Sequence, residues 1–303
     1  EISQSNGRTR AFMKIQDGCD RFCTYCIIPY ARGGKVRSRD MESIINEAKT
    51  LAENGYEEVV LTGIHVASYG KDLREEDVTL LDVIKKINEI DGIKRIRTSS
   101  VEPILFTDEF VNEVSKMEKV MPHYHLSLQS GCDETLKRMN RRYTTEEFEI
   151  VTKILRKYYP NAALTTDIIV GFPGETEEDF ADTYNWIKKL HFNQLHVFPY
   201  SRRKGTPADR MPSQVPGDVK KERVRRLLQL SDELKTEFAL SEMNKELEVL
   251  IEEEKDGYMV GHASNYLKVL VADTSLKEGH IYKVKVTDHR GYDLIGVVSS
   301  EEA

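Results

Sequence analysis

Three cysteines, Cys19, Cys23 and Cys26, lie within eight residues near the start of the chain. Their C-x₃-C-x₂-C spacing supplies three thiolates from one loop, and three thiolates can ligate three corners of a [4Fe–4S] cluster. The fourth iron then keeps an open coordination position, which in a metalloprotein accepts a substrate or a cofactor. S-adenosylmethionine (SAM) can fill that position through its amino and carboxylate groups. The motif therefore predicts a cluster that cleaves bound SAM reductively.

Two other interpretations of these cysteines stay open from the residues alone. One is a zinc knuckle with a remote fourth ligand, such as a histidine or Cys132, although zinc motifs usually come as two separated cysteine pairs. The other is a redox dithiol at Cys23 and Cys26, which would not need Cys19. Three crowded cysteines out of four suit a metal site in a reducing compartment better than a disulfide framework, and we therefore predict a cytoplasmic protein.

Composition is that of an ordinary water-soluble protein, with 39% hydrophobic and 31% charged residues in 303. The longest apolar runs have the length of a strand and cannot span a bilayer, so we expect no membrane partner. Net charge is −7, but the last 63 residues carry −6 of it. The preceding region is nearly neutral and contains dense basic clusters, which are either solvated helix faces or parts of an RNA footprint.

Hydrophobic patterning alternates between strands and helices over the first 240 residues. Strands are expected at 11–16, 58–62, 93–101, 123–129, 163–170 and 194–198, and helices at 41–54, 79–90, 107–117, 133–139, 145–158, 176–190 and 219–242. Six strand–helix repeats predict an α/β fold, a partial (β/α)₆ TIM-like barrel. Its chemistry should lie at the C-terminal ends of the strands, where the cysteine loop falls.

The last part of the chain has a different pattern. Short strands are expected at 248–252, 258–263, 268–272, 282–288 and 293–298, with glycine turns separating most of them. Five short strands fit a small all-β barrel of the OB-like kind that often binds nucleic acids. We therefore predict two domains, residues 1–240 and 241–303.

Several segments carry a family resemblance. They are the stretch KIQDGCDRFCTYCIIPYARGGKVRSR at 14–39, LTGIH at 61–65, RIRTSS at 95–100, LSLQSG at 126–131, LKRMNRRY at 136–143, DIIVGFPGE at 167–175 and LHVFPYS at 195–201. In these segments the chain resembles the radical-SAM methylthiotransferases, and its last sixty residues resemble their RNA-binding TRAM domain. The residues at 62–65, 97–100 and 196–201 are most similar to those of the branch that acts on N6-threonylcarbamoyladenosine in tRNA.

The resemblance implies a function. A member of this branch adds a methylthio group at C2 of the modified adenosine next to the anticodon, with the tRNA anticodon stem-loop as partner and a flavodoxin or ferredoxin as electron donor. Branches that act on isopentenyladenosine in tRNA or on an aspartate of a ribosomal protein are the alternatives, and a non-catalytic RNA-binding module with structural zinc is the alternative of another class. Family members carry a second [4Fe–4S] cluster in an N-terminal domain that this sequence lacks. We therefore expect a truncated form that cleaves SAM without completing methylthiolation.

Candidate cofactor contacts follow partly from the resemblance and partly from position. By resemblance, the Tyr25 backbone and the stretch starting at Gly171 lie near the adenine of SAM. Gly63 ends a strand, where it either lets the SAM amino group approach or forms a turn. Ser127 and Gln129 share one strand face, so they contact the ribose or make structural hydrogen bonds.

Charged and aromatic residues supply further candidates. Arg142 can clamp the SAM carboxylate or a tRNA phosphate. Asp167, a charge inside a strand, needs a partner and is a candidate contact for SAM or substrate. His65 and His196 are either supporting residues or structural ones. In the TRAM-like part, unpaired bases can stack on aromatic residues, and the candidates there are Tyr258, His262, Asn265, Tyr266 and Lys268.

Overall fold

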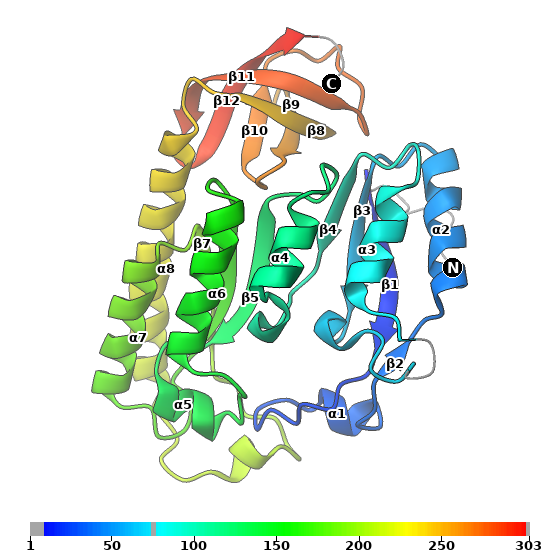
Figure 1. Cartoon of the computed structure of the whole chain (residues 1–303). Coiled ribbons are helices and arrows are strands. Elements are labelled where there is room, and N and C mark those ends of the chain that lie inside the picture. Colours follow the sequence, from blue (N-terminus) through cyan, green and yellow to red (C-terminus); the bar gives the residue numbers. More distant parts are fainter. Residues whose placement is uncertain (1–8, 74–76, 301–303) are drawn as a thin grey trace.

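The computed structural model describes residues 9–73 and 77–300 as a curved α/β domain with a small β-barrel at one end (Figure 1). Six parallel strands form the large domain: β1 (Arg10–Asp17), β3 (Glu58–Gly63), β4 (Arg95–Thr98), β5 (His123–Gln129), β6 (Ala163–Val170) and β7 (Gln194–Pro199). Parallel ladders join β1, β3 and β4, and a second set joins β5, β6 and β7. Isolated bridges, including Val101 to Leu126, connect the two sets. Within the described ranges no ladder joins β7 to β1, so the barrel is partial.

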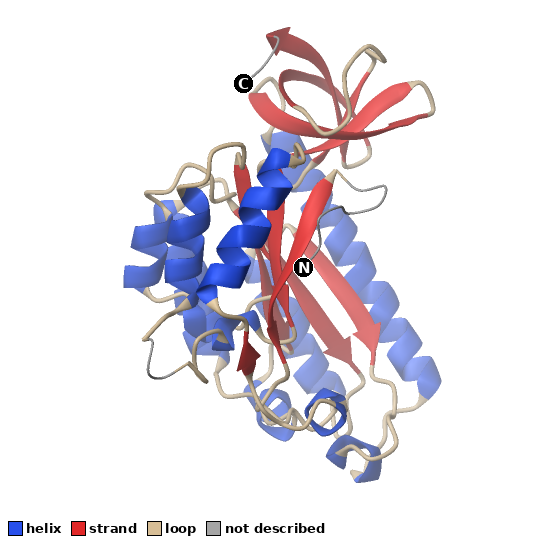
Figure 2. Ribbon diagram, turned by 90° about the vertical axis from the view of Figure 1, so that its right-hand side faces the viewer, coloured by secondary structure: helices blue, strands red, loops and turns tan. Residues whose placement is uncertain are grey.

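Helices cover the outer face of this sheet (Figure 2). They are α2 (Met41–Glu53), α3 (Leu80–Asn88), α4 (Asp108–Val114), α5 (Asp133–Arg138), α6 (Thr145–Tyr158), α7 (Glu177–Leu190) and the long α8 (Gly217–Ser241). Thr176 and Asp179 form the capping box expected at the start of α7, and similar boxes begin α3 and α6. Each helix buries an apolar stripe against the strands, in two adjoining cores. The expected partial (β/α)₆ barrel is therefore confirmed.

Some short elements were missed by the sequence patterns. These are α1 (Ile28–Ala31), the antiparallel strand β2 (Arg37–Ser38) and the 3₁₀ turns η1 (Val66–Ser68), η2 (Pro103–Leu105) and η3 (Pro207–Arg210). All of them are too short to show a hydrophobic period. Four of the five (α1, β2, η1 and η2) follow the C-terminal end of β1, β3 or β4, so they help to build the rim where the cysteine loop lies.

The C-terminal domain is a closed five-stranded barrel, as expected. Its strands are β8 (Glu246–Lys255), β9 (Tyr258–Ala263), β10 (Lys268–Val271), β11 (Ile281–Arg290) and β12 (Asp293–Ser300), paired in the order β10-β12-β11-β8-β9. Alternate residues of each strand fill one small core. Gly261 permits close packing, because a Cβ there would lie 2.1 Å from the carbonyl oxygen of Leu250. The strand β8 begins five residues after α8 ends.

This small barrel sits on the N-terminal ends of the parallel strands, opposite the cysteine loop (Figure 1). Arg95 donates to the backbone carbonyl of Glu248 at 2.8 Å, and Arg97 donates to that of Ala263 at 3.0 Å. Arg97 also pairs with buried Glu58 at 2.9 Å. Buried guanidinium groups need such partners, so this polar junction holds the two domains in one arrangement.

Two of the aromatic residues that we expected to stack on bases are part of this junction. The ring of Tyr266 stacks on His123 at 4.4 Å with an angle of 5°, and His262 stacks on its other side at 4.8 Å. The guanidinium groups of Arg10 and Arg97 each lie 5.0 Å from the Tyr266 ring. These contacts occupy Tyr266, so in this arrangement it serves the junction.

None of the described helices is long and apolar enough to cross a membrane.

Candidate metal centre and cofactor cavity

The cysteine loop runs from the end of β1 to α1, and contacts at both ends hold its shape. Gly18 adopts φ +73°, and a Cβ there would lie 2.0 Å from the carbonyl oxygen of Lys35, so the loop can turn here only at a glycine. Thr24 is tied to the helix α5 region by its amide, which donates to the Met139 carbonyl at 3.0 Å. Its own carbonyl accepts from Ala208 at 2.9 Å. The loop is therefore anchored to distant parts of the barrel.

All three thiols of the loop face one cavity of about 360 Å³ and none forms a disulfide. Burial raises the pKa of the Cys19 and Cys26 thiols, and the neighbouring thiol of Cys23 raises both further. Three crowded cysteines suit a cationic ligand, because a bound metal stabilises all three thiolates at once. Cys132 lies elsewhere, with its sulfur 3.5 Å from Asp179.

The cysteines and their cavity together fit a cluster with an open position. Three thiolates from one loop can ligate three irons of a [4Fe–4S] cluster. The cavity that these cysteines line has room beside them for a second ligand.

A buried charge network borders the same cavity. Glu102 accepts from Arg21 at 2.6 Å, from Arg141 at 3.1 Å and from His65 at 3.0 Å. Burial raises the pKa of Glu102, but the His65 hydrogen bond and the charges of Arg141 and Arg21 outweigh it and lower that pKa to about 2. The carboxylate therefore stays ionised and holds Arg141 in place.

Arg141 connects this network to the cysteine loop. Its Nη1 donates to the sulfur of Cys23 at 3.2 Å, and its Nη2 donates to the Ser127 carbonyl at 3.2 Å. Sequence reasoning missed Arg21, Glu102 and Arg141, because they come from three separate loops whose proximity no local pattern shows. The adjacent pair Arg141 and Arg142 after α5 was a weak signal, because it indicates that an arginine faces the site without showing which one.

Four of the predicted cofactor contacts do come together here. Tyr25, Gly63, Ser127 and Gln129 line the cavity of the three cysteines. Close packing also favours a glycine at position 63, because a Cβ there would lie 2.8 Å from Oε1 of Gln16. Gln129 adopts φ +77°, an unusual conformation for a side-chain-bearing residue that is concentrated at functional sites. Their contacts with SAM remain predictions.

The other three predicted contacts lie apart from this lining. Arg142 is exposed, and its neighbour Arg141 occupies the cavity instead. The amide of Gly171 donates to Glu175 at 2.8 Å, and the Lys220 side chain packs over its Cα. Asp167 lines a second cavity inside the barrel, where it meets His125 and His196.

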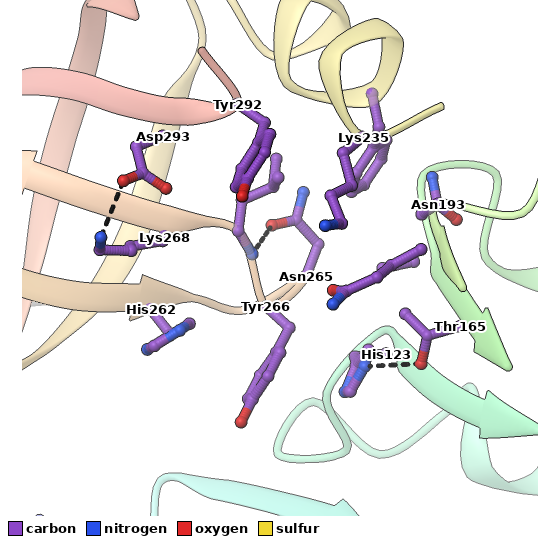
Figure 3. A pocket seen from close by; sticks show the side chains of 14 residues that line it. His123, Thr165, Asn193, Lys235, His262, Asn265, Tyr266, Lys268, Tyr292 and Asp293 are labelled. Atoms are coloured by element: carbon purple, nitrogen blue, oxygen red, sulfur yellow. Dashed lines mark hydrogen bonds and ion pairs between the residues drawn. The ribbon is translucent and has the colours of Figure 1, made fainter. Parts of the chain in front are cut away.

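A third cavity, of about 290 Å³, lies at the junction of the two domains (Figure 3). Tyr266 projects into it between His262 and His123, while Lys235 and Asn193 approach from the large domain. Lys268 and Asp293 pair across its upper wall at 2.7 Å. This cavity is at the end of the barrel away from the cysteine loop, so it is separate from the candidate metal centre.

A three-cysteine loop at the C-terminal rim of a partial (β/α) barrel, beside a cavity for a second ligand, defines an iron–sulfur enzyme that activates a bound cofactor. The particular family follows from comparison with known sequences. The chain belongs to the radical SAM superfamily, whose family model matches residues 13–187. Membership implies a [4Fe–4S] cluster and SAM as cofactors, as the cysteine motif predicted.

Known proteins resemble the chain in sequence along nearly its whole length. It is 48% identical over 292 residues to the threonylcarbamoyladenosine tRNA methylthiotransferase MtaB of Bacillus subtilis, covering 94% of this chain and 64% of that protein. It is 43% identical over 292 residues to the tRNA-2-methylthio-N(6)-dimethylallyladenosine synthase of Thermoanaerobacter pseudethanolicus, covering 95% of this chain and 61% of that protein. The chain thus spans less than two thirds of these relatives.

Solved structures support the fold. The radical SAM methyltransferase TsrM of Kitasatospora setae matches with a TM-score of 0.55 at 18% identity, over 66% of this chain and 38% of that one. Coproporphyrinogen III oxidase HemN of Escherichia coli matches with a TM-score of 0.54 at 18% identity, over 77% of this chain and 53% of that one. At 18% sequence identity, this structural similarity shows a shared barrel fold.

Proposed function

We propose that this chain is the radical-SAM part of a tRNA methylthiotransferase that modifies C2 of N6-threonylcarbamoyladenosine next to the anticodon. The observation that carries the proposal is the 48% identity to the Bacillus subtilis enzyme over 94% of the chain. The cysteine loop and its cavity are consistent with it, because they provide the cluster and cofactor positions that the reaction needs.

In this proposal the residues of the chain bind and orient the cofactor. Cys19, Cys23 and Cys26 hold the [4Fe–4S] cluster, which when bound supplies the electron for reductive cleavage of SAM. Arg141, Gly63, Ser127 and Gln129 line the cavity. Arg141 would bind the carboxylate of SAM, and Gly63 would leave space for its amino group. Ser127 and Gln129 would bind the ribose. The walls of the barrel exclude water from the reacting atoms.

The tRNA approaches the rim that carries the cysteine loop. Exposed basic residues lie on this rim, at Arg32, Arg37, Arg142, Arg202 and Arg203. Such residues neutralise phosphates, and their position supports the proposal that an anticodon loop binds next to the cavity. We propose a flavodoxin or ferredoxin as the electron donor and the cytoplasm as the location.

Transfer of a labelled hydrogen tests the substrate. The reconstituted chain is incubated anaerobically with SAM, reductant and an anticodon stem-loop that carries deuterium at C2 of N6-threonylcarbamoyladenosine. We expect deuterium in the 5′-deoxyadenosine product, as measured by mass spectrometry. This readout reports the reacting position and does not require a sulfur donor. SAM cleavage without deuterium transfer from this RNA would contradict the proposed substrate.

One alternative rests on a specific observation, the 43% identity to a dimethylallyladenosine-modifying enzyme. The same experiment with a dimethylallyladenosine stem-loop distinguishes the two, because the preferred RNA should transfer its deuterium faster. Transfer from neither RNA would favour the ribosomal-protein aspartate as substrate. Zinc content without iron–sulfur absorption or a Mössbauer signal would support the non-catalytic zinc module.

A further inference from the structure

A second group of potential metal ligands lies inside the barrel, away from the cysteines. His125 of β5, Asp167 of β6 and His196 of β7 come from three adjacent strands. Asp167 and His196 are direct partners in the β6–β7 ladder, and His125 lies opposite Thr165 in the β5–β6 ladder. Because side chains alternate along a strand, the three side chains project to the same inner face. Rigid strands therefore fix their spacing.

The distances suit coordination of one ion. Nε2 of His125 lies 3.1 Å from Oδ2 of Asp167, and Nδ1 of His196 lies 3.5 Å from Oδ1 of the same carboxylate. One ligand atom from each residue can be chosen so that all three lie within 4.8 Å of one another. Nitrogen and oxygen ligands about 2.0–2.2 Å from a tetrahedral metal are about 3.3–3.6 Å apart, so small side-chain movements complete the site.

Thr165 orients the first histidine. Its Oγ1 lies 2.8 Å from Nδ1 of His125 and 3.4 Å from Nε2 of His123. Nε2 of His123 is placed to accept a hydrogen bond from the threonine hydroxyl. That hydroxyl then accepts from Nδ1–H of His125, which leaves the lone pair of Nε2 directed at Asp167. Metal-binding histidines are commonly held by such an outer partner.

The carboxylate of the group lies between the two imidazoles. Asp167 is half-buried, and its salt-bridge partners in the described part of the chain are His125 and His196, which are charged only when protonated. A half-buried carboxylate without a permanent positive partner is costly, and a divalent cation supplies that partner.

The cluster also has room for further ligands. It borders a cavity of about 330 Å³ that is lined by Thr98, Ser99 and Ser100. Ser99 and Ser100 line the cysteine cavity too, so the two spaces adjoin. We propose that His125, Asp167 and His196 bind one divalent transition-metal ion such as Zn²⁺, with open positions facing the chamber where the cofactor binds. Two imidazoles, one carboxylate and an open position form a donor set that such ions accept.

Metal binding can be measured without interference from the cluster. In the full chain carrying Cys19→Ala, Cys23→Ala and Cys26→Ala, the loop thiolates are gone and Zn²⁺ is titrated calorimetrically, with zinc counted after dialysis. We expect one equivalent per chain, at least 100-fold weaker binding in Asp167→Asn and in His196→Gln, and 10- to 100-fold weaker binding in Thr165→Val. The exposed His191→Asn serves as the matched control and should bind as tightly as its parent.

Circular dichroism on each variant separates lost binding from lost folding. His196 is the most exposed of the three ligands, so its glutamine variant keeps the test valid if Asp167→Asn unfolds. Absence of a zinc equivalent in the folded parent would overturn the proposal. Unchanged affinity in folded Asp167→Asn or His196→Gln would overturn it equally. The result is independent of which adenosine the enzyme modifies.

Discussion

Arg141 donates a hydrogen bond from Nη1 to the sulfur of Cys23 at 3.2 Å. The same guanidinium pairs with buried Glu102, so one residue couples the cysteine loop to the charge network at the mouth of the barrel. Its neighbour Arg142 is exposed. The two arginines differ by one position in sequence, yet the structure assigns them different surroundings, and this difference can be tested.

We expect Arg141→Met to weaken SAM binding at least tenfold in the anaerobically reconstituted chain, measured by equilibrium dialysis. The variant removes the positive charge that we propose for binding the cofactor carboxylate, while keeping a similar side-chain length. Arg142→Met is the matched control and should change affinity less than twofold. The reverse order of effects would restore Arg142 as the residue that clamps SAM.

Iron content separates the loop cysteines from the fourth one. We expect about four irons per reconstituted wild-type chain, and loss of most iron–sulfur absorption in Cys26→Ala. Cys132→Ala should keep both, because its sulfur lies beside Asp179 and outside the cavity lining. Iron loss in folded Cys132→Ala would show that this thiol takes part in cluster binding.

Glu102 should make stability depend on acid pH. Its pKa is lowered to about 2 in the folded chain, so its stabilising contribution is present above the unfolded pKa of about 4.5 and is lost as pH falls toward 2. A difference of that size corresponds to about 3 kcal/mol of unfolding free energy. Urea denaturation between pH 6 and pH 2.5 should show a steeper loss in wild type than in Glu102→Gln.

The exposed Glu109→Gln variant is the control for that experiment and should follow wild type. Equal slopes in wild type and Glu102→Gln would mean that the carboxylate is not selectively stabilised in the folded chain. The absolute stability of Glu102→Gln at neutral pH is a separate matter, because the substitution also leaves Arg21 and Arg141 without their acceptor.

The domain junction should be sensitive to Arg97. Replacing it by leucine removes its hydrogen bond to buried Glu58. It also removes the hydrogen bonds to the carbonyls of Ser264 and Ala263 in the small barrel. Breaking a buried pair in this way costs about 3–5 kcal/mol of unfolding free energy. Arg225→Leu removes an exposed pair with Glu222 and should lower the unfolding free energy much less. Urea denaturation followed by circular dichroism compares the two, and similar small losses would contradict a structural role for the junction.

Much of the fold followed from sequence because its elements are long and periodic. The strands at 123–129 and 163–170 and the helix at 145–158 have the bounds that the patterns predicted. The third strand was predicted at 93–101 and is regular only over Arg95–Thr98, since its ends leave the ladder to join loops. Alternation along β5 also placed Ser127 and Gln129 on one face, and both line the cysteine cavity.

The choice between Arg141 and Arg142 shows where sequence reasoning reaches its limit. Asn140, two residues after α5 ends, adopts a left-handed conformation at φ +59°, which redirects the chain before both arginines. That turn directs the first inward and the second outward, and no composition or spacing rule predicts the direction. Glu102 was missed for a related reason, because its partners Arg21, His65 and Arg141 come from three different loops.

Ligand spacing and hydrophobic period are local properties of the chain, so the residues alone were enough to predict the chemistry of the cysteine loop and the order of strands and helices. Tertiary structure alone decided which charges surround the cysteines, how Arg95 and Arg97 attach the small barrel, and that Asp167 meets two histidines. Each of those contacts joins residues that are distant in sequence and near in space, and strand register and loop direction bring them together.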